Sequence, residues 1–174
     1  MNRIVLGGAQ LGLPYGILNG GETLSREEVA RILDTAVDHG IDSIDTAIAY
    51  GQSESIIGET SQNRFNIISK LPPLPVDISN VSEWVHSQVQ GSLSRLKCTS
   101  LEALLLHRPQ DLTGAQGAEL YAAIGSLMAE KMIHRFGVSI YSPDDLEGII
   151  GTFDIQVVQA PLNVFDRRIL GITN

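Results

Sequence analysis

The feature that most constrains the fold of this chain is an alternation between short apolar runs and longer amphipathic stretches. Runs rich in leucine and β-branched residues recur six times, at residues 3–6, 41–45, 65–70, 101–107, 133–138 and 155–160. Stretches with helical periodicity lie between them, at residues 53–60, 81–96, 117–130 and 143–150. Strands that alternate with helices in this way form a parallel sheet covered by helices. We therefore predict an α/β protein built from repeated βα units.

The segment before the second predicted strand carries the clearest helix signal. Ser25 followed by Glu28 is a capping box, in which each side chain accepts a hydrogen bond from the other residue's backbone N–H. Gly40 follows as a stop after a stripe of apolar residues at helical spacing, namely Val29, Ile32, Leu33, Ala36 and Val37. These signals predict a helix between Ser25 and Gly40.

Composition limits the partners and the compartment. A length of 174 residues with 43% apolar content suits one domain with its own core. The net charge of −8, with scattered Lys and Arg, disfavours nucleic acid and anionic membranes as partners. The single cysteine, Cys98, favours a reducing compartment, so we expect a cytoplasmic protein. The first apolar run stops at Leu6, too short for a signal peptide or a membrane span.

Four side chains with chemical potential fall at or just beyond the ends of predicted strands. Asp45 ends the second strand, Lys70 the third and His107 the fourth, while Tyr50 lies in the loop after the second. The carboxyl ends of parallel barrel strands share one rim, and active sites are built there. We therefore expect these four side chains to converge.

Each of the four also has an ordinary explanation when taken alone. Asp45 could cap a helix, Tyr50 could be a loop aromatic, Lys70 a solvated charge and His107 a hydrogen-bonded core residue. Taken together, apolar runs that end in Lys and His place ionisable groups at a partly buried mouth, which favours a functional site.

The chemistry that suits this set is acid-assisted hydride transfer. An ammonium group at Lys70 favours the phenolate form of Tyr50 and so makes its hydroxyl a better proton donor. Asp45 would hold Lys70 in place, and His107 could donate a hydrogen bond to a substrate carbonyl oxygen that gains negative charge. None of these side chains can supply hydride, so a cofactor must carry it.

Residues 45–54 closely resemble the aldo/keto reductase signature D-T-A-x-x-Y-G-x-S-E. Residues 68–70, 92–96 and 104–107 also resemble that family's lysine strand, the following helix and the strand that ends in the catalytic histidine. The resemblance covers essentially the whole chain. It implies a (β/α)8 TIM barrel that uses NADPH, or NADH, to reduce a small-molecule aldehyde or ketone, or to run the reverse oxidation, without a metal. It also implies that Asp45, Tyr50, Lys70 and His107 are the catalytic group.

The same resemblance suggests cofactor-binding residues. Residues 136–139 are similar to the family's I-G-V-S-N stretch, whose Ser and Asn hold the nicotinamide carboxamide; Ser139 matches, whereas Ile140 replaces the Asn and removes one polar contact. Gln159 resembles a glutamine that contacts the same carboxamide, although it could equally cap the strand end. Gly7 and Gly8 resemble the glycine-rich first turn beside the cofactor, although glycine there could serve the turn alone.

Two other sites are less consistent with the sequence. The stretch from Gly7 to Gly12 is similar to a Rossmann phosphate loop, but Ala9 occupies its third position and Pro14 follows where a helix should begin. The remaining histidines, His39, His86 and His134, lack metal-ligand spacing with one another or with Cys98. We therefore expect no metal site.

A complete (β/α)8 barrel has eight strands in about 250 residues, and only six strands are predicted here. We expect residues 1–174 to form a single aldo/keto reductase-like domain truncated to about six βα units, with the C-terminal units missing and the oligomeric state open. Two rival functions remain. Lys70 could form a Schiff base in an aldolase, or the chain could be a non-catalytic barrel fragment or scaffold.

Overall fold

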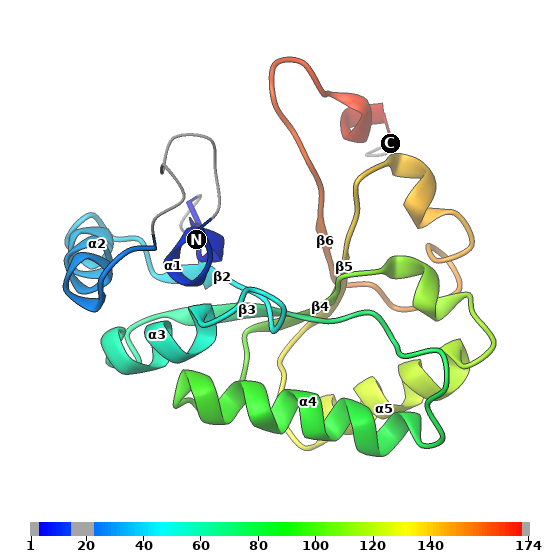
Figure 1. Ribbon diagram of the computed structural model, residues 1–174. Coiled ribbons are helices and arrows are strands. Elements are labelled where there is room, and N and C mark those ends of the chain that lie inside the picture. Colours follow the sequence, from blue (N-terminus) through cyan, green and yellow to red (C-terminus); the bar gives the residue numbers. More distant parts are fainter. Residues whose placement is uncertain (1–3, 15–22, 172–174) are drawn as a thin grey trace.

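A six-stranded parallel sheet forms the centre of the computed structural model, which describes residues 4–14 and 23–171 (Figure 1). Each strand pairs with the next one along the chain, so that the order in space equals the order in sequence; the strands are β1 (Leu6–Gly7), β2 (Ser43–Asp45), β3 (Asn66–Leu71), β4 (Ala103–Leu106), β5 (Phe136–Ser139) and β6 (Val157–Gln159). Sequential order is typical of βα barrels, whereas the Rossmann sheet reverses its order at a switch point. The predicted barrel-type α/β fold is therefore confirmed for six strands, with β1 and β6 at the edges.

The four long helices lie side by side in chain order against the sheet (Figure 1). They are α2 (Arg26–Asp38), α3 (Ser53–Thr60), α4 (Val81–Leu96) and α5 (Gly117–Ala129), and shorter turns are α1 (Ala9–Gly12), η1 (Pro109–Leu112), η2 (Pro143–Leu146) and η3 (Arg168–Gly171). None of the helices within the described ranges is long and apolar enough to cross a membrane.

Helix α2 begins and ends where the sequence predicts. The Ser25 hydroxyl accepts a hydrogen bond from the Glu28 N–H, and the Glu28 carboxylate accepts one from the Ser25 N–H at 2.9 Å. Gly40 has φ +74°, a left-handed conformation that favours glycine and lets the chain turn back toward β2. The predicted capping box is therefore confirmed.

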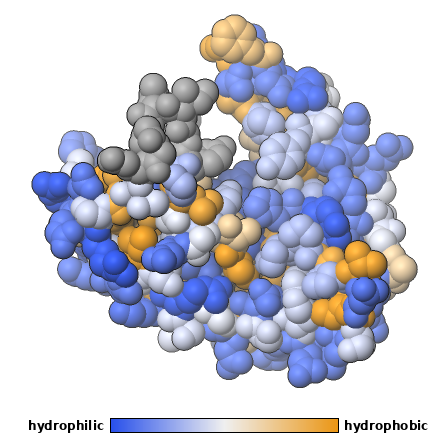
Figure 2. Space-filling model, in the orientation of Figure 1, coloured by the Kyte–Doolittle hydropathy of each residue, from blue (hydrophilic) through white to orange (hydrophobic). Residues whose placement is uncertain are grey.

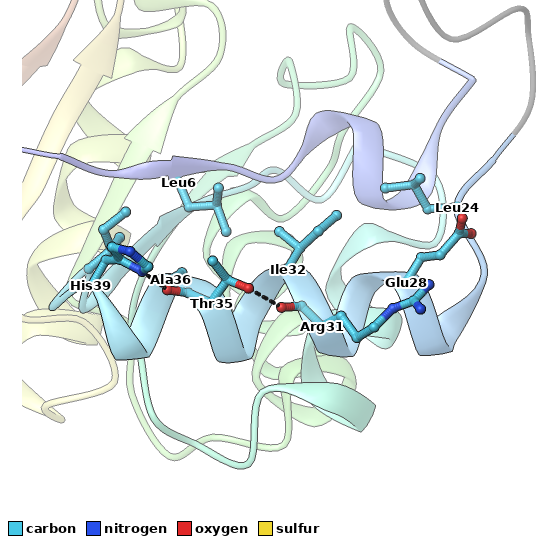
Figure 3. Close-up of a pocket in the computed structure, with 9 residues that line it drawn as sticks. Leu6, Leu24, Glu28, Arg31, Ile32, Thr35, Ala36 and His39 are labelled. Atoms are coloured by element: carbon cyan, nitrogen blue, oxygen red, sulfur yellow. Dashed lines mark hydrogen bonds between the residues drawn. The ribbon is translucent and has the colours of Figure 1, made fainter.

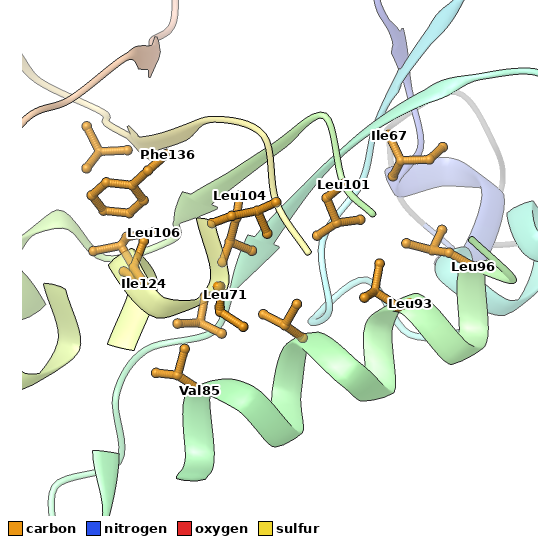
Figure 4. Close-up of a cluster of buried hydrophobic side chains, with 14 of the residues drawn as sticks. Ile67, Leu71, Val85, Leu93, Leu96, Leu101, Leu104, Leu106, Ile124 and Phe136 are labelled. Atoms are coloured by element: carbon orange, nitrogen blue, oxygen red, sulfur yellow. The ribbon is translucent and has the colours of Figure 1, made fainter. Parts of the chain in front are cut away.

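The core lies between the sheet and its helices, and Figure 4 shows its centre. All four residues of β4 are buried, and two of them, Leu104 and Leu106, share an apolar cluster with side chains of α4 and α5, among them Val85, Leu93, Leu96 and Ile124. Full burial of one such side chain contributes roughly 1.5–3 kcal/mol. One continuous apolar cluster extends from Leu11 to Ile149, so the sheet and helices share a single core.

The predicted helix over residues 143–150 is wrong. Only the 3-10 turn η2 forms there, with Ser142 as its cap. Glu147 is extended at φ −62° and ψ 132°, and Gly148 is left-handed at φ +72°, so neither residue continues a helix. Apolar spacing alone did not reveal this backbone break.

Five of the six strands are shorter than predicted, whereas β3 keeps its predicted length and is shifted by one residue. Within β1, the strand begins at Leu6; Ile4 and Val5 are irregular, and residue 3 lies outside the described ranges. Leu101 forms only an isolated bridge with Ile133 before β4 begins. The helix α1 was not predicted at all, because four residues are too few to show a helical period.

Candidate active site

The four predicted catalytic residues lie together at the carboxyl ends of β2, β3 and β4. Asp45 is the last residue of β2, Lys70 the penultimate residue of β3, and His107 follows β4 directly. The His107 N–H donates a hydrogen bond of 3.1 Å to the Leu71 carbonyl, which extends the strand pairing by one step. Tyr50 lies in the turn between β2 and α3.

Lys70 is the most deeply buried of these residues, with only 1% of its surface exposed. Its ammonium donates hydrogen bonds to both Asp45 carboxylate oxygens, at 2.6 and 2.7 Å, and to the Thr46 carbonyl at 3.0 Å. An ammonium has three donors, so each finds an acceptor. Burial lowers the pKa of Lys70, and the Asp45 carboxylate opposes that shift. The three acceptors offset part of the cost of burying an ammonium.

Tyr50 lies beside both Lys70 and His107. The Lys70 Nζ is 5.2 Å from the centroid of the Tyr50 ring, within the range of a cation–π contact. The Tyr50 and His107 ring centroids are 6.0 Å apart, in an edge-to-face arrangement at 80°. Burial lowers the pKa of His107, the Lys70 charge lowers it further, and Asp45 opposes both effects. A neutral imidazole is therefore favoured at this rim.

The turn that carries Tyr50 rests directly on α1. A side chain at Gly12 would overlap the backbone nitrogen of Ser53, and Gly51 is left-handed at φ +56°. The Ser53 hydroxyl donates a hydrogen bond of 2.8 Å to the Gly8 carbonyl and shares another of 2.9 Å with the Thr46 hydroxyl. The close approach of α1 to this turn escaped the sequence interpretation, which considered Gly12 only as part of a phosphate loop.

The two predicted cofactor-binding glycines differ in their packing. Gly8 is buried, and a Cβ there would lie 2.9 Å from the Asp45 carbonyl oxygen, so packing alone requires glycine. Gly7 is exposed, and a Cβ would meet nothing within 4 Å. Both glycines line a hollow of about 200 Å³ together with Ala9, Gln10, Asp45 and Tyr50.

The other two predicted cofactor-binding residues form a pair at the same rim. The Ser139 hydroxyl donates a hydrogen bond of 3.3 Å to the Gln159 side-chain oxygen, across the ends of β5 and β6. The Ile140 N–H donates to the Gln159 carbonyl at 2.8 Å, while the Ile140 side chain is only 3% exposed and packs in the core. Ile140 therefore serves packing and offers no polar side chain to a ligand.

Glu54 is a residue whose importance the sequence interpretation missed. It is 2% exposed and accepts hydrogen bonds from Ser69 at 2.7 Å, Ser92 at 2.6 Å and Arg95 Nε at 2.9 Å. These contacts join α3, β3 and α4. The signature does contain this glutamate. Its hydrogen-bond partners, however, lie 15, 38 and 41 residues away, so no local pattern links them to it.

A hollow larger than the one beside Asp45 and Tyr50 lies elsewhere, between β1 and α2 (Figure 3). It measures about 560 Å³ and its walls are mostly apolar, with Leu6 facing Ile32 and Ala36. None of the four predicted catalytic residues lines it. Its size alone does not identify it as the reaction site, although Glu28, Arg31, Thr35 and His39 bring polar groups to its lining. Over residues 4–14 and 23–171, no group of three or more His, Cys, Asp or Glu side chains could hold a metal ion.

A parallel sheet with sequential strand order and ionisable groups at its carboxyl rim is the arrangement of a βα barrel with a candidate site at the usual face. The family model described as "Aldo/keto reductase family" matches residues 3–170. The chain belongs to the aldo/keto reductase family, as the signature at residues 45–54 predicted.

Several relatives show how much of the family fold is present. D-arabinose 1-dehydrogenase of Saccharomyces cerevisiae is 27% identical over 189 aligned residues, which cover 98% of this chain and 55% of that protein. The glycerol dehydrogenase structure from Gluconobacter oxydans has a TM-score of 0.74 at 25% identity, covering 97% of this chain and 54% of that one. An aldo-keto reductase from Klebsiella pneumoniae in complex with NADPH has a TM-score of 0.63 at 25% identity, covering 86% and 49%. The chain therefore spans about half the length of these relatives.

Proposed function

We propose that residues 1–174 form a single aldo/keto reductase domain that carries the proton-transfer site of an NADPH-dependent carbonyl reductase. The observation that supports this most directly is the Lys70 ammonium, held on Asp45 and lying 5.2 Å from the Tyr50 ring centroid. The substrate class is a small aldehyde or ketone, which becomes an alcohol. The free, half-buried thiol of Cys98 is compatible with the reducing cytoplasm.

Each residue has a distinct role in this proposal. Tyr50 donates its hydroxyl proton to the substrate carbonyl oxygen, and the Lys70 ammonium stabilises the phenolate that remains. His107 donates a hydrogen bond to the same oxygen as its negative charge grows. Asp45 fixes the position of Lys70 through both carboxylate oxygens.

The residues present fit a nicotinamide cofactor. The Ser139 and Gln159 side chains together offer hydrogen-bond donors and acceptors, which a carboxamide needs, and they lie at the rim that carries Tyr50. Gly7 and Gly8 leave space beside Asp45 and would flank the cofactor. NADPH, when bound, supplies the hydride, and the Klebsiella relative is a complex with NADPH. NADH is the alternative donor.

The test is NADPH oxidation with a reactive aromatic aldehyde. Tyr50→Phe removes the proton donor and is expected to lower kcat by about 10²–10⁴-fold. Tyr121→Phe is the matched control, because Tyr121 lies on α5 and its hydroxyl only accepts a hydrogen bond from the Asp154 N–H. Equal losses in both variants, or no loss in Tyr50→Phe, would contradict the proposal.

The burial of Lys70 and its lowered pKa favour one rival, a Schiff-base aldolase. Borohydride reduction in the presence of a carbonyl substrate would then attach the substrate to Lys70, as peptide mass spectrometry can detect. The proposed reductase gives no such adduct. A scaffold protein, in contrast, would show neither an adduct nor NADPH binding by fluorescence titration.

A further inference from the structure

Glu54 is a buried carboxylate that the proposed proton transfer does not use. Its Oε2 accepts from the Arg95 guanidinium, at 2.9 Å from Nε and 2.8 Å from Nη2, and its Oε1 accepts from Ser69 and Ser92. A buried carboxylate without partners is strongly unfavourable, and this one is fully engaged. Through these hydrogen bonds, Glu54 joins α3 to β3 and α4, and we call this group of contacts the Glu54 junction.

One arm of this junction reaches the strand that carries Lys70. Ser69 and Lys70 are consecutive in β3, so their side chains point to opposite faces of the sheet. Ser69 is held by Glu54 from the helix side, at 2.7 Å, and Lys70 is held by Asp45 from the other side. A rotation of β3 about its axis would stretch both contacts at once.

The other end of the junction reaches the turn that carries Tyr50. Glu54 and Ser53 are the first two residues of α3, and the turn with Tyr50 immediately precedes them. Ser53 ties this helix start to Gly8 and Thr46, while Glu54 ties it to β3. The start of α3 is therefore fixed to β3 and to the residues that directly follow β1 and β2.

We propose that Glu54 is a positioning residue which, through Ser69, sets the Lys70 ammonium against Asp45 and Tyr50. This inference rests on the proposed function, because positioning matters for the transfer of a proton from Tyr50. Displacement of a catalytic group by about 1 Å can lower a rate by about 10²-fold, so a strand that rotates slightly would be costly.

Two serines provide a matched pair of variants. Ser69 and Ser92 are both 0% exposed, and each donates to the same oxygen of Glu54, at 2.7 and 2.6 Å. Ser69→Ala and Ser92→Ala therefore remove the same group from the same acceptor without changing the charge. Only Ser69 adjoins Lys70, whereas Ser92 lies on α4. This pair is sharper than Glu54→Gln, which would leave the Arg95 charge without its partner.

We expect both variants to lower the urea midpoint of unfolding to a similar extent. Only Ser69→Ala should lower kcat, by about tenfold at unchanged KM, because only it releases β3. Equal kcat values for the two variants would overturn the proposal, since a purely structural junction affects both alike.

A second readout does not depend on turnover. The sequence contains three lysines, Lys70, Lys97 and Lys131, so NMR signals of isotope-labelled lysine side chains can be assigned individually. Because Asp45 raises the pKa of Lys70 against the effect of burial, a loosened contact should move that pKa downward in Ser69→Ala and leave it unchanged in Ser92→Ala. An unchanged or raised pKa in Ser69→Ala would refute the positioning role. If the wild-type chain shows no turnover, the proposed function fails, and this titration alone decides the role of Glu54.

Discussion

Strands β4 and β6 occupy equivalent places in different βα units but differ sharply in burial. All four residues of β4 are buried between β3 and β5 under the long helices, whereas β6 pairs only with β5 and none of its three residues is buried. The segment after β6 exposes Leu162, Val164 and Phe165, at 57%, 83% and 98%. Figure 2 shows hydrophobic surface on the part that projects at the top of the molecule. The strand that is flanked on both sides is therefore the buried one.

This difference separates the two halves of the proposed site. Asp45, Lys70 and His107 come from β2, β3 and β4, the interior strands of the sheet. The candidate cofactor-binding residues come from β1 and from the β5–β6 edge. The group proposed for proton transfer is therefore better supported by packing than the group proposed for cofactor binding.

The largest effect on the free energy of unfolding is expected when leucine is replaced by alanine in β4, compared with the same replacement in the segment after β6. Leu104→Ala in β4 removes a side chain that is 0% exposed and should lower the free energy of unfolding by about 2–5 kcal/mol. Leu162→Ala removes one that is 57% exposed and should change it by less than about 0.5 kcal/mol. Urea unfolding measures both values. Similar losses would mean that the segment after β6 is packed more tightly than its exposure indicates.

A glycine pair tests the β5–β6 edge. A Cβ at Gly137 in β5 would overlap the Val157 carbonyl, so Gly137→Ala should lower the free energy of unfolding by about 1–3 kcal/mol. At Gly125, an exposed position in α5, a Cβ meets nothing within 4 Å, so Gly125→Ala should raise it by up to about 1 kcal/mol. Thermal unfolding distinguishes the two signs. A neutral Gly137→Ala would show that β6 can move away from β5.

The smallest effect concerns the electrostatics of the interior strands. Burial lowers the pKa of His107 and the Lys70 charge lowers it further, so Lys70→Met should raise it. Lys131→Met, which alters a lysine just after α5, should leave it unchanged. Histidine NMR titration reports both values, and no rise in Lys70→Met would contradict the close approach of β3 and β4 at the rim.

The same shift makes stability depend on pH. The folded state binds the His107 proton more weakly than the unfolded state, so stability falls as pH drops from 6.5 through the folded pKa, and levels off below it. His107→Gln should remove this part of the pH dependence of urea unfolding. If the free energy of unfolding of His107→Gln depends on pH as strongly as that of the wild type, other groups cause this dependence.

Much of the fold could be predicted from local patterns. The capping box of Ser25 and Glu28 and the six apolar runs predicted α2 and the six strands, because caps and periodicity involve residues close in sequence. The helix predicted over residues 143–150 failed because the left-handed Gly148 and extended Glu147 override the apolar spacing. The helix α1 was missed because it is a single turn.

The sequence by itself determined the βα repeat, the family signature and the positions of Asp45, Tyr50, Lys70 and His107 near strand ends. Only the tertiary structure decided that Lys70 is buried on Asp45, that Glu54 binds serines from β3 and α4, and that Ile140 packs in the core. The reason is geometric. Hydrogen bonds and burial depend on positions within a few tenths of an ångström, and those positions are set by how distant segments pack against one another.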